Sequence, residues 1–451
     1  MAGDVRVANI SAALSTSAGG STNFTKSGFG TPKACRITIS FDAVDDTGVA
    51  VQSKVSIGLS DFTNNYCISH QDEDNSAKVD CDALKSNTKA YVVLDVGGSV
   101  LFSGTATTTT DGVTLTHTAG EAPSSGFFAS VTMYGGADLA VSQQRTTINS
   151  SQDGTATIPH SGFTDGNDKI IFFIGTDIGQ EDSANSGINN SFGVCHATGS
   201  DAGGWTLTQR CIGWASDHNN TVGTPHSILS TDRVLDIITE AGGQDWGLEV
   251  TNLDHSPAEW TVTTRDAGAG AGMEVYSLAL DLDDRKAKVG EIFLPDSGTS
   301  WTPSVSLGFT PQYVGLSITD MLSLDTIHSN SSAAQLGISS NTGSGEETCH
   351  SWYNADNSAI TDTNNLFRSR VIDFRNAGVL STIFWDMSHS SFNDGDWTYA
   401  INSEAANVSR KAVYWTIEEA AVPDVTDEEW AGTLGFGQQE PVREPNEIVS
   451  Y

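Results

Sequence analysis

Polar and apolar residues alternate along many short stretches of this chain, a period-two pattern that predicts β-strands with one buried face. Residues 36–41 read RITISF, and Val131 and Met133 stand between the polar neighbours Ser130, Thr132 and Tyr134. Gly, Ser, Thr, Asn and Asp fill the gaps and favour tight turns. Because an apolar sheet face needs a second sheet to cover it, we predict an all-β chain of antiparallel sandwiches, jelly-roll-like, with the strand connectivity left open.

Two short segments depart from this strand pattern. Residues 231–240, TDRVLDIITE, and residues 426–432 are the helix candidates. Ser230 or Thr231 has the side chain that caps a helix N-terminus and is expected to cap the first of them.

Three stretches of the chain open in the same way. SGFGTPKACRITISF from Ser27, SGFTDGNDKIIFFIG from Ser161 and LGFTPQYVGLSIT from Leu307 each carry a Gly-Phe pair ahead of a β-rich run. In each pair a glycine that tolerates unusual backbone dihedrals precedes an aromatic anchor. Self-similarity of this kind indicates an internal repeat.

Two further landmarks recur in the same order. Cys67, Cys211 and Cys349 are each followed eight residues later by Asn, and the third residue after each Cys is His or Trp. The closing strands are FFASVTMYGG from Phe127, MEVYSLALDL from Met273 and RKAVYWTIEE from Arg410. We expect the three Cys to occupy equivalent small apolar core sites.

These landmarks predict five segments. They are an N-terminal arm at 1–27, sandwich modules at 28–145, 146–300 and 301–419, and an acidic C-terminal arm at 420–451. The connectors between modules are too short and too apolar for flexible linkers, so neighbouring modules are expected to pack together. The N-terminal arm is extended or lends a strand to a neighbour. The C-terminal arm either hangs free or docks its aromatic residues on another subunit.

Length and charge narrow the classes of function. A chain of 451 residues is too long for one core and, at roughly 100 to 200 residues per domain, is expected to hold about three. Acidic residues outnumber basic ones 56 to 22, a net charge of −34 that repels nucleic acid and anionic membranes. The first residues lack the pattern of a secretory signal, and no apolar run approaches the roughly 18 to 20 residues of a membrane span. We expect a soluble protein made in the cytoplasm.

Chemical motifs are scarce in this chain. No HExxH, GxSxG, GxxxxGK[ST] or properly placed GxGxxG motif is present, so we expect no catalytic residue, no cofactor and no enzyme. The six Cys are too sparse for a disulfide scaffold and are expected to be buried free thiols, although Cys67 with Cys81, or Cys195 with Cys211, remain possible pairs.

Acidic and histidine residues leave a metal site open, although none is assigned. Asp72, Asp74, Asn75, Asp80 and Asp82 resemble a Ca²⁺-binding string in composition but lack its Gly and terminal Glu. Asn393, Asp394, Gly395 and Asp396 are expected to form a hairpin turn. The histidines near the second landmark, His70, His218 and His350, are expected to line a loop.

Sugar chemistry is a further open possibility. A glycosidase pair of carboxylates is defined by distance in space and cannot be read from a sequence. Exposed aromatic side chains could stack on sugars, but most are expected to be core or hairpin anchors; the candidates are Trp205, Trp214, Trp246, Trp260, Trp301, Trp352, Trp385, Trp397, Tyr353 and Tyr399.

The opening ISAALSTSAG with FTKSGFGTPKA, the recurring GFTP start and the Met133-Tyr134-Gly135-Gly136 strand end resemble virion proteins of tailed bacteriophages, particularly those of marine bacteria. The resemblance implies a structural protein on the particle surface, in a tail, fibre or spike that contributes to host attachment, assembled in the host cytoplasm. The alternatives are a capsid-decorating or collar protein and a polysaccharide-degrading enzyme. The implied partners are other virion proteins, copies of itself as a homotrimer, and a host surface glycan.

Overall fold

The computed structural model describes residues 4–41, 50–51, 53–72, 80–123, 126–177, 181–216, 218, 225–239, 241–268, 272–319, 323–329, 334–343, 345–354, 363–376, 379–404 and 410–419. The chain divides into a compact unit, Ala2–Ala420, and a second unit of Met1 with Ala421–Tyr451. The predicted C-terminal arm at 420–451 and the helix candidate at 426–432 lie outside the described residues.

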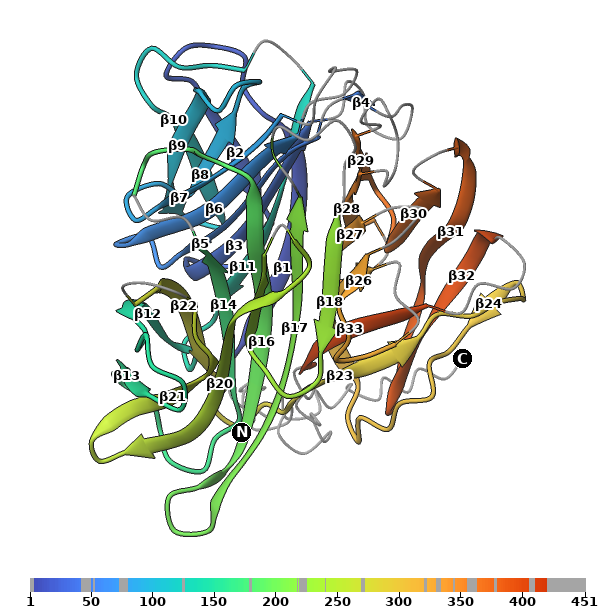
Figure 1. Cartoon of the computed structure of the whole chain (residues 1–451). Coiled ribbons are helices and arrows are strands. Elements are labelled where there is room, and N and C mark those ends of the chain that lie inside the picture. Colours follow the sequence, from blue (N-terminus) through green and yellow to red (C-terminus); the bar gives the residue numbers. More distant parts are fainter. Residues whose placement is uncertain are drawn as a thin grey trace, which may run out of the picture. The chain divides into compact units, whose positions relative to one another are not determined.

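Within this described part every regular element is a strand, which confirms the all-β prediction (Figure 1). The first module contains β1 (Arg6–Ala13), β2 (Ser21–Thr25), β3 (Pro32–Phe41), β4 (Ala50–Val51), β5 (Ser53–Ser60), β6 (Asn65–Asp72), β7 (Cys81–Ser86), β8 (Tyr91–Leu94), β9 (Val100–Thr109), β10 (Gly112–His117) and β11 (Phe127–Gly135). The second contains β12 (Ala140–Thr147), β13 (Thr155–Pro159), β14 (Lys169–Thr176), β15 (Asn185–Ser186), β16 (Ile188–Ser200), β17 (Gly204–Ser216), β18 (His226–Ser230), β19 (Leu235–Ile238), β20 (Gln244–His255), β21 (Ala258–Asp266) and β22 (Glu274–Asp281). The third contains β23 (Ala287–Phe293), β24 (Ser300–Trp301), β25 (Pro311–Thr319), β26 (His328–Ser329), β27 (Ala334–Asn341), β28 (Glu347–Asn354), β29 (Thr363–Arg368), β30 (Ile372–Asn376), β31 (Val379–Asn393), β32 (Asp396–Glu404) and β33 (Lys411–Glu418).

Each module is a sandwich of a larger and a smaller antiparallel sheet. In the first module the larger sheet has the order β1-β11-β3-β5-β6-β7 and the smaller one β2-β10-β9-β8. The second module repeats this as β12-β22-β14-β16-β17-β18 with β13-β21-β20-β19, and the third as β23-β33-β25-β27-β28-β29 with β24-β32-β31-β30. The chain is therefore three tandem copies of one strand order.

The three sequence landmarks occupy equivalent places in the three modules. Gly28, Gly162 and Gly308 have φ of 77°, 73° and 75°, a left-handed conformation that favours glycine, in the turns before β3, β14 and β25. The landmark Cys residues lie on β6, β17 and β28, opposite Gly58, Gly193 and Ser339 of the preceding large-sheet strand. The closing runs are β11, β22 and β33.

Short strands close the three modules into a ring. The two-residue strand β15 of the second module extends the first module's large sheet at β7, β26 of the third module extends the second at β18, and β4 of the first extends the third at β29. Their partners are the equivalent positions Ala83, Ser227 and Asn365, each three residues before the residue that faces the landmark Cys. Each module thus lends a strand to the module before it, and the first lends to the third.

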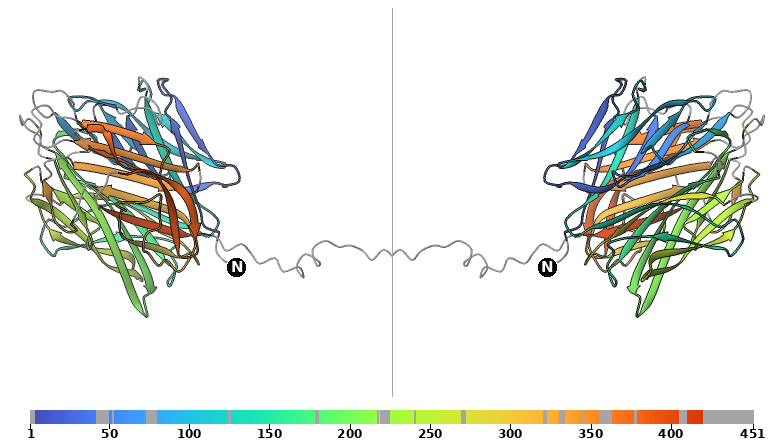
Figure 2. Two further views of the ribbon diagram at one scale, coloured as in Figure 1. Left: turned by 90° about the vertical axis from the view of Figure 1, so that its right-hand side faces the viewer. Right: turned by 90° about the vertical axis from the view of Figure 1, so that its left-hand side faces the viewer.

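Two kinds of core result from this arrangement. An outer core lies between the two sheets of each module, and a central core draws residues from all three large sheets. The large-sheet strands β5 and β14 are buried at every position. Alternate residues of β14 enter the central core and the second module's outer core, whereas β5 supplies apolar residues to the central core and turns small polar residues toward the smaller sheet. The views in Figure 2 show the strands of the three modules packed directly against one another.

An aromatic triangle lies where the three large sheets meet. Its members are His70, Trp214 and Trp352, each the third residue after its landmark Cys. The ring centroids are 5.9 Å apart for His70 and Trp214, 5.5 Å for His70 and Trp352, and 5.7 Å for Trp214 and Trp352. Each module contributes one aromatic side chain, so the triangle couples the packing of all three modules.

The N-terminal segment and the connectors belong to the sheets. Residues 1–27, expected to form an arm, contribute β1, which pairs with β11, and β2, which pairs with β10 of the same module. Phe24 of β2 is fully buried. The two connectors supply the equivalent pairs, β12 with β13 and β23 with β24, so the repeating unit starts about one strand pair before the Gly-Phe landmark.

The helix candidate at 231–240 is wrong. Leu235–Ile238 is strand β19, which pairs with β20 in the second module's smaller sheet. Val234, Leu235, Ile237 and Ile238 are all buried, so burial on both faces of a strand replaces the helical periodicity. The described part of the chain has no helix with the length and apolar character to cross a membrane.

Candidate functional site

The three histidines near the second landmark have different surroundings. His70 in β6 and His350 in β28 lie in strands and are buried, which lowers the pKa of each to about 3. The His350 ring lies 2.7 Å from Ser40 Oγ and 2.6 Å from Ser130 Oγ, so it connects the third module to the first. The expectation of a shared loop is therefore wrong for His70 and His350. His218 lies outside the strands, just after β17.

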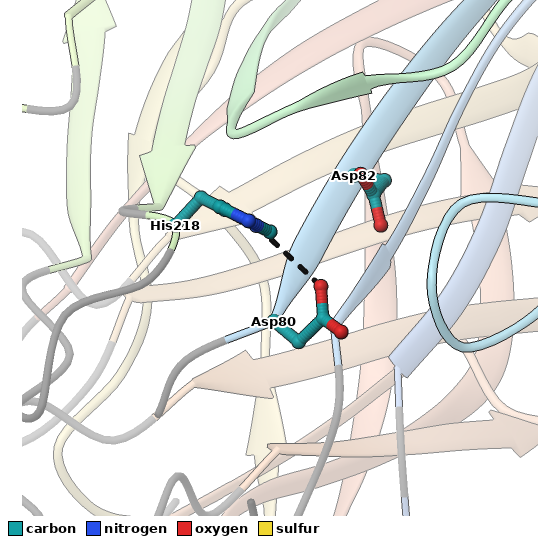
Figure 3. A group of neighbouring side chains, drawn as sticks. All are labelled: Asp80, Asp82 and His218. Carbon is teal, nitrogen blue, oxygen red and sulfur yellow. Dashed lines mark ion pairs between the residues drawn. The ribbon is translucent and has the colours of Figure 1, made fainter. Parts of the chain in front are cut away.

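His218 of the second module meets two aspartates of the first (Figure 3). Its Nδ1 lies 3.0 Å from the carbonyl oxygen of Cys81 and 3.5 Å from Asp80 Oδ1. One ligand-type atom from each of Asp80, Asp82 and His218 lies within 4.8 Å of the others. We call these three residues the junction cluster.

Strand geometry explains how the two aspartates come together. Residues i and i+2 of a strand point to the same face, so Asp80 and Asp82 lie on one side of β7 and Cys81 on the other. The carbonyl oxygen of Cys81 accepts hydrogen bonds from Gly187 N at 2.8 Å, just after the lent strand β15, and from His218. Ring closure therefore positions all three side chains.

The cluster is partly buried and carries excess negative charge. Asp82 is only 7% exposed, and burial raises the pKa of its carboxyl, an effect that the nearby charge of Asp80 increases. Gln71 faces Asp82 across the strand pair and donates Nε2 to Asp82 Oδ2 at 2.9 Å and to the carbonyl of Asp80 at 3.3 Å. The Oε1 atom of the fully buried Gln71 has no hydrogen-bond partner among the described residues.

Two carboxylates and an imidazole form a donor set suited to a divalent cation. Of the acidic string noted in the sequence, the structure brings together Asp80 and Asp82. Asp72 pairs with Cys81 on the strand and accepts a hydrogen bond from Ser216 Oγ at 3.3 Å, and Asp74 and Asn75 lie outside the described residues. Sequence reasoning missed His218 as their companion because it belongs to another module.

A second group, Asp165, Asp201 and His255, lies within the second module. The carboxylate of Asp201 accepts hydrogen bonds from His255 Nδ1 at 3.0 Å, Trp205 Nε1 at 3.0 Å and His255 N at 3.1 Å. These hydrogen bonds lower the pKa of Asp201 to about 2. The group therefore fastens the tip of the β16–β17 hairpin to the end of β20.

Two pairs of acidic residues share a hydrogen bond. They are Asp177 with Asp245 and Glu181 with Glu274, and lost hydration together with Asp245 raises the pKa of Asp177 to about 7. A hydrogen-bonded pair is closer than the roughly 5 to 5.5 Å that separates the carboxyl groups of a retaining glycosidase, and much closer than in an inverting one. These pairs do not have glycosidase spacing.

Most of the aromatic sugar-binding candidates are core residues. Seven of them are at most 5% exposed: Trp214, Trp246, Trp260, Trp352, Trp385, Trp397 and Tyr399. Trp205 and Trp301 are half-buried, and the side chain of Tyr353 lies outside what the structure describes. The Trp205 ring stacks on His255 at 5.3 Å and has Lys169 Nζ 4.9 Å from its centre. Asn393 and Asp396 end β31 and begin β32, so the expected hairpin turn is confirmed.

A surface cavity lies near the place where the lent strand β15 pairs with β7. Its volume is about 270 Å³, and its lining residues are Leu84, Lys89, Val92, Val100, Ser103, Glu121 and Asp182. Glu121 Oε2 already accepts hydrogen bonds from the backbone and hydroxyl of Ser103, and Lys89 Nζ donates to Thr118. The cavity is slightly smaller than the roughly 300 to 1,000 Å³ of most small-molecule sites.

All six cysteines are buried, and none forms a disulfide bond. Cys67 faces Ser86 and Cys81 faces Asp72 along the β6–β7 pair, so the two thiols are five positions apart. Cys195 faces Gln209 and Cys211 faces Gly193, two positions apart.

Comparison of the chain with protein-family models, with curated proteins and with solved structures found no match in any of the three.

Proposed function

We propose that this chain is a non-enzymatic structural protein on the surface of a tailed-bacteriophage particle, in a tail, fibre or spike that contributes to host attachment. The observation that carries the proposal is the closed ring. Strand lending ties three sandwiches into one body around a shared core and covers one edge of each large sheet. Covered edges resist edge-to-edge aggregation, which matters for a protein displayed in many copies at high local concentration.

The contact surface is proposed to lie in the second module. Its strands β16 and β17 are 13 residues each, longer than their counterparts β5 and β6 at eight, and the turn between them is exposed (Figure 1). The hydrogen bonds of Asp201 hold this hairpin tip in place. A pre-ordered hairpin loses little entropy on binding and suits contact with another virion protein or a host surface glycan.

The capsid-decorating or collar function is a second candidate. The three modules present the same strand order around one centre. Such a body matches a place on a particle where three subunits meet. In the homotrimer implied by the resemblance, each of the three chains would be a complete ring of three modules. The mass of the protein in solution at micromolar concentration tests this trimer, and a lone monomer would rule the trimer out.

Immunogold labelling of intact particles with antibodies against the purified chain tests the proposed location. Label on the tail or its appendages, with few copies per particle by quantitative mass spectrometry, is the expected result. Label over the head with many copies would favour the decorating function, and absence of the chain from purified particles would refute both.

The enzymatic alternative needs a separate experiment. The purified chain is incubated with host capsule or lipopolysaccharide, and the length of the polysaccharide is followed by size-exclusion chromatography. The non-enzymatic assignment predicts no shortening of the polysaccharide. Shortening of the polysaccharide would overturn the non-enzymatic assignment.

A further inference from the structure

The three junctions of the ring have the same backbone pairing but different side chains. We number the junctions by the module that receives the lent strand. The residue opposite the second residue of the lent strand is Asp82 in the first junction, His226 in the second and Asn364 in the third. Pairing of the lent strand therefore does not require a carboxylate at this position. The acidic character of the first junction needs another explanation.

Asp82 is costly in the absence of a cation. Asp82 is only 7% exposed, and Asp80, two residues before it, adds a second carboxylate to the same cluster. A buried carboxylate is destabilising unless it is paired. The neighbours on hand are the amide of Gln71 and the imidazole of His218. Gln71 reaches both aspartates through its Nε2, yet its buried Oε1 has no partner among the described residues. A cation at this point would neutralise both carboxylates, and turning the Gln71 amide over would present its unpartnered Oε1 to the ion in place of Nε2.

We propose that the junction cluster binds one divalent transition-metal ion of the Zn²⁺ or Mn²⁺ class, which ties the first module to the second. Asp80 and Asp82 supply carboxylate oxygens, and His218 supplies a ring nitrogen. The ring nitrogen that lies toward the carboxylates is Nδ1, 3.5 Å from Asp80 Oδ1, so coordination through it would replace its contact of 3.0 Å with the carbonyl oxygen of Cys81. The imidazole is the reason to prefer this class over Ca²⁺, which takes oxygen ligands.

The ion would act where two modules meet. Asp80 immediately precedes β7 and Asp82 is its second residue, whereas His218 follows β17 of the second module. Binding at this place stabilises the folded ring because the ligands come together only when the junction has formed.

Calorimetric titration of the chelator-treated full chain with Zn²⁺, Mn²⁺, Ca²⁺ and Mg²⁺ tests the proposal. We expect one Zn²⁺ or Mn²⁺ per chain at this site, with a rise in Tm of roughly 3 °C at a hundredfold excess over Kd for a chain of this size. Asp82→Asn and His218→Ala should each weaken that binding by about tenfold or more. Asn is the residue at this position in the third module, so Asp82→Asn is expected to fold and its metal-free Tm should equal or exceed that of the wild type.

Asp201→Asn is the matched control, because it alters the other Asp-Asp-His group, which lies inside a single module. It should leave the junction binding unchanged. Equal metal affinity in the wild type, Asp82→Asn and His218→Ala would overturn the proposal, as would Ca²⁺ binding without Zn²⁺ or Mn²⁺ binding, or no binding at all. The result does not depend on where the chain resides in a particle.

Discussion

Replacing Trp352 with alanine tests whether the ring of modules is held at its centre. Trp352 is 5% exposed, and its ring contacts the rings of both other modules, His70 at 5.5 Å and Trp214 at 5.7 Å. Truncating a buried Trp to Ala costs about 3 to 5 kcal/mol. Because Trp352 Nε1 is buried without a hydrogen-bond partner among the described residues, its removal relieves a small penalty, so we expect about 3 to 4 kcal/mol.

The assay is guanidinium-induced unfolding followed by far-ultraviolet circular dichroism, which does not depend on the fluorescence of the residue removed. Trp352→Ala, Trp214→Ala and the double variant form a mutant cycle. Direct ring contact predicts a coupling free energy of about 0.5 to 1.5 kcal/mol between the two sites.

Trp260→Ala is the matched control. Trp260 is fully buried in the outer core of the second module, so its truncation should cost a similar free energy. Combined with Trp352→Ala it should be additive within about 0.5 kcal/mol, because the two side chains belong to separate cores. A loss below about 1 kcal/mol for Trp352→Ala, or no coupling with Trp214, would refute the central role of the triangle.

Three further predictions concern the buried polar and sulfur groups. Burial lowers the pKa of His70 and His350 to about 3, so the unfolded chain takes up protons that the folded chain does not, and the free energy of unfolding should fall as pH drops from about 6.5 toward 3. Isoleucine stands at the position of His350 in the other two modules, so His350→Ile should flatten the dependence of the unfolding midpoint on pH. An unchanged pH dependence would contradict the assignment. Arg36 is buried, its guanidinium lies over the rings of Phe192 and Trp415, and it donates to Ser340 Oγ without a described acidic partner. Arg36→Met should therefore cost less than about 1 kcal/mol in chemical unfolding, and a larger loss would show that the guanidinium is required. All six thiols are buried, and burial raises the pKa of Cys349 to about 11, so none should react with a thiol reagent before unfolding and six should react after it; a fast-reacting thiol in the native chain would refute this.

The repeated landmarks show how far local sequence determines local structure. A glycine at positive φ before an aromatic anchor, a small Cys opposite a small residue and an alternating closing strand recur because each satisfies a local steric requirement. Such requirements leave a pattern at fixed spacing, so strand class and number of modules were predictable from the chain alone.

Burial on two faces weakened the sequence signal in other places. Residues 235–238 form β19, yet their apolar run with one Asp resembles a helix segment. The segment 6–25 has few large apolar residues, which favoured an arm, but its backbone pairs with β11 and β10 and its one large aromatic residue, Phe24, fills the core. Edge strands gain their stability from backbone pairing with a partner about 100 residues away, and composition does not report that pairing.

The junction cluster shows the same limit at the level of a site. Its two aspartates could be noted as a candidate string, because two carboxylates two residues apart on a strand share a face. Their companion His218 is 136 residues beyond Asp82 in the chain and lies beside it only in the folded structure, where β15 pairs with β7.

The amino-acid sequence by itself determined an all-β chain of three copies of one sandwich, because turns, alternation and small core residues act over a few positions. The tertiary structure decided that the copies close into a ring through β4, β15 and β26 and that His70, Trp214 and Trp352 meet at its centre. A two-residue strand is too short to show a periodic pattern. An aromatic side chain that faces inward leaves the same local sequence pattern whether it packs against one sheet or against two. Those features depend on backbone hydrogen bonds and packing between modules.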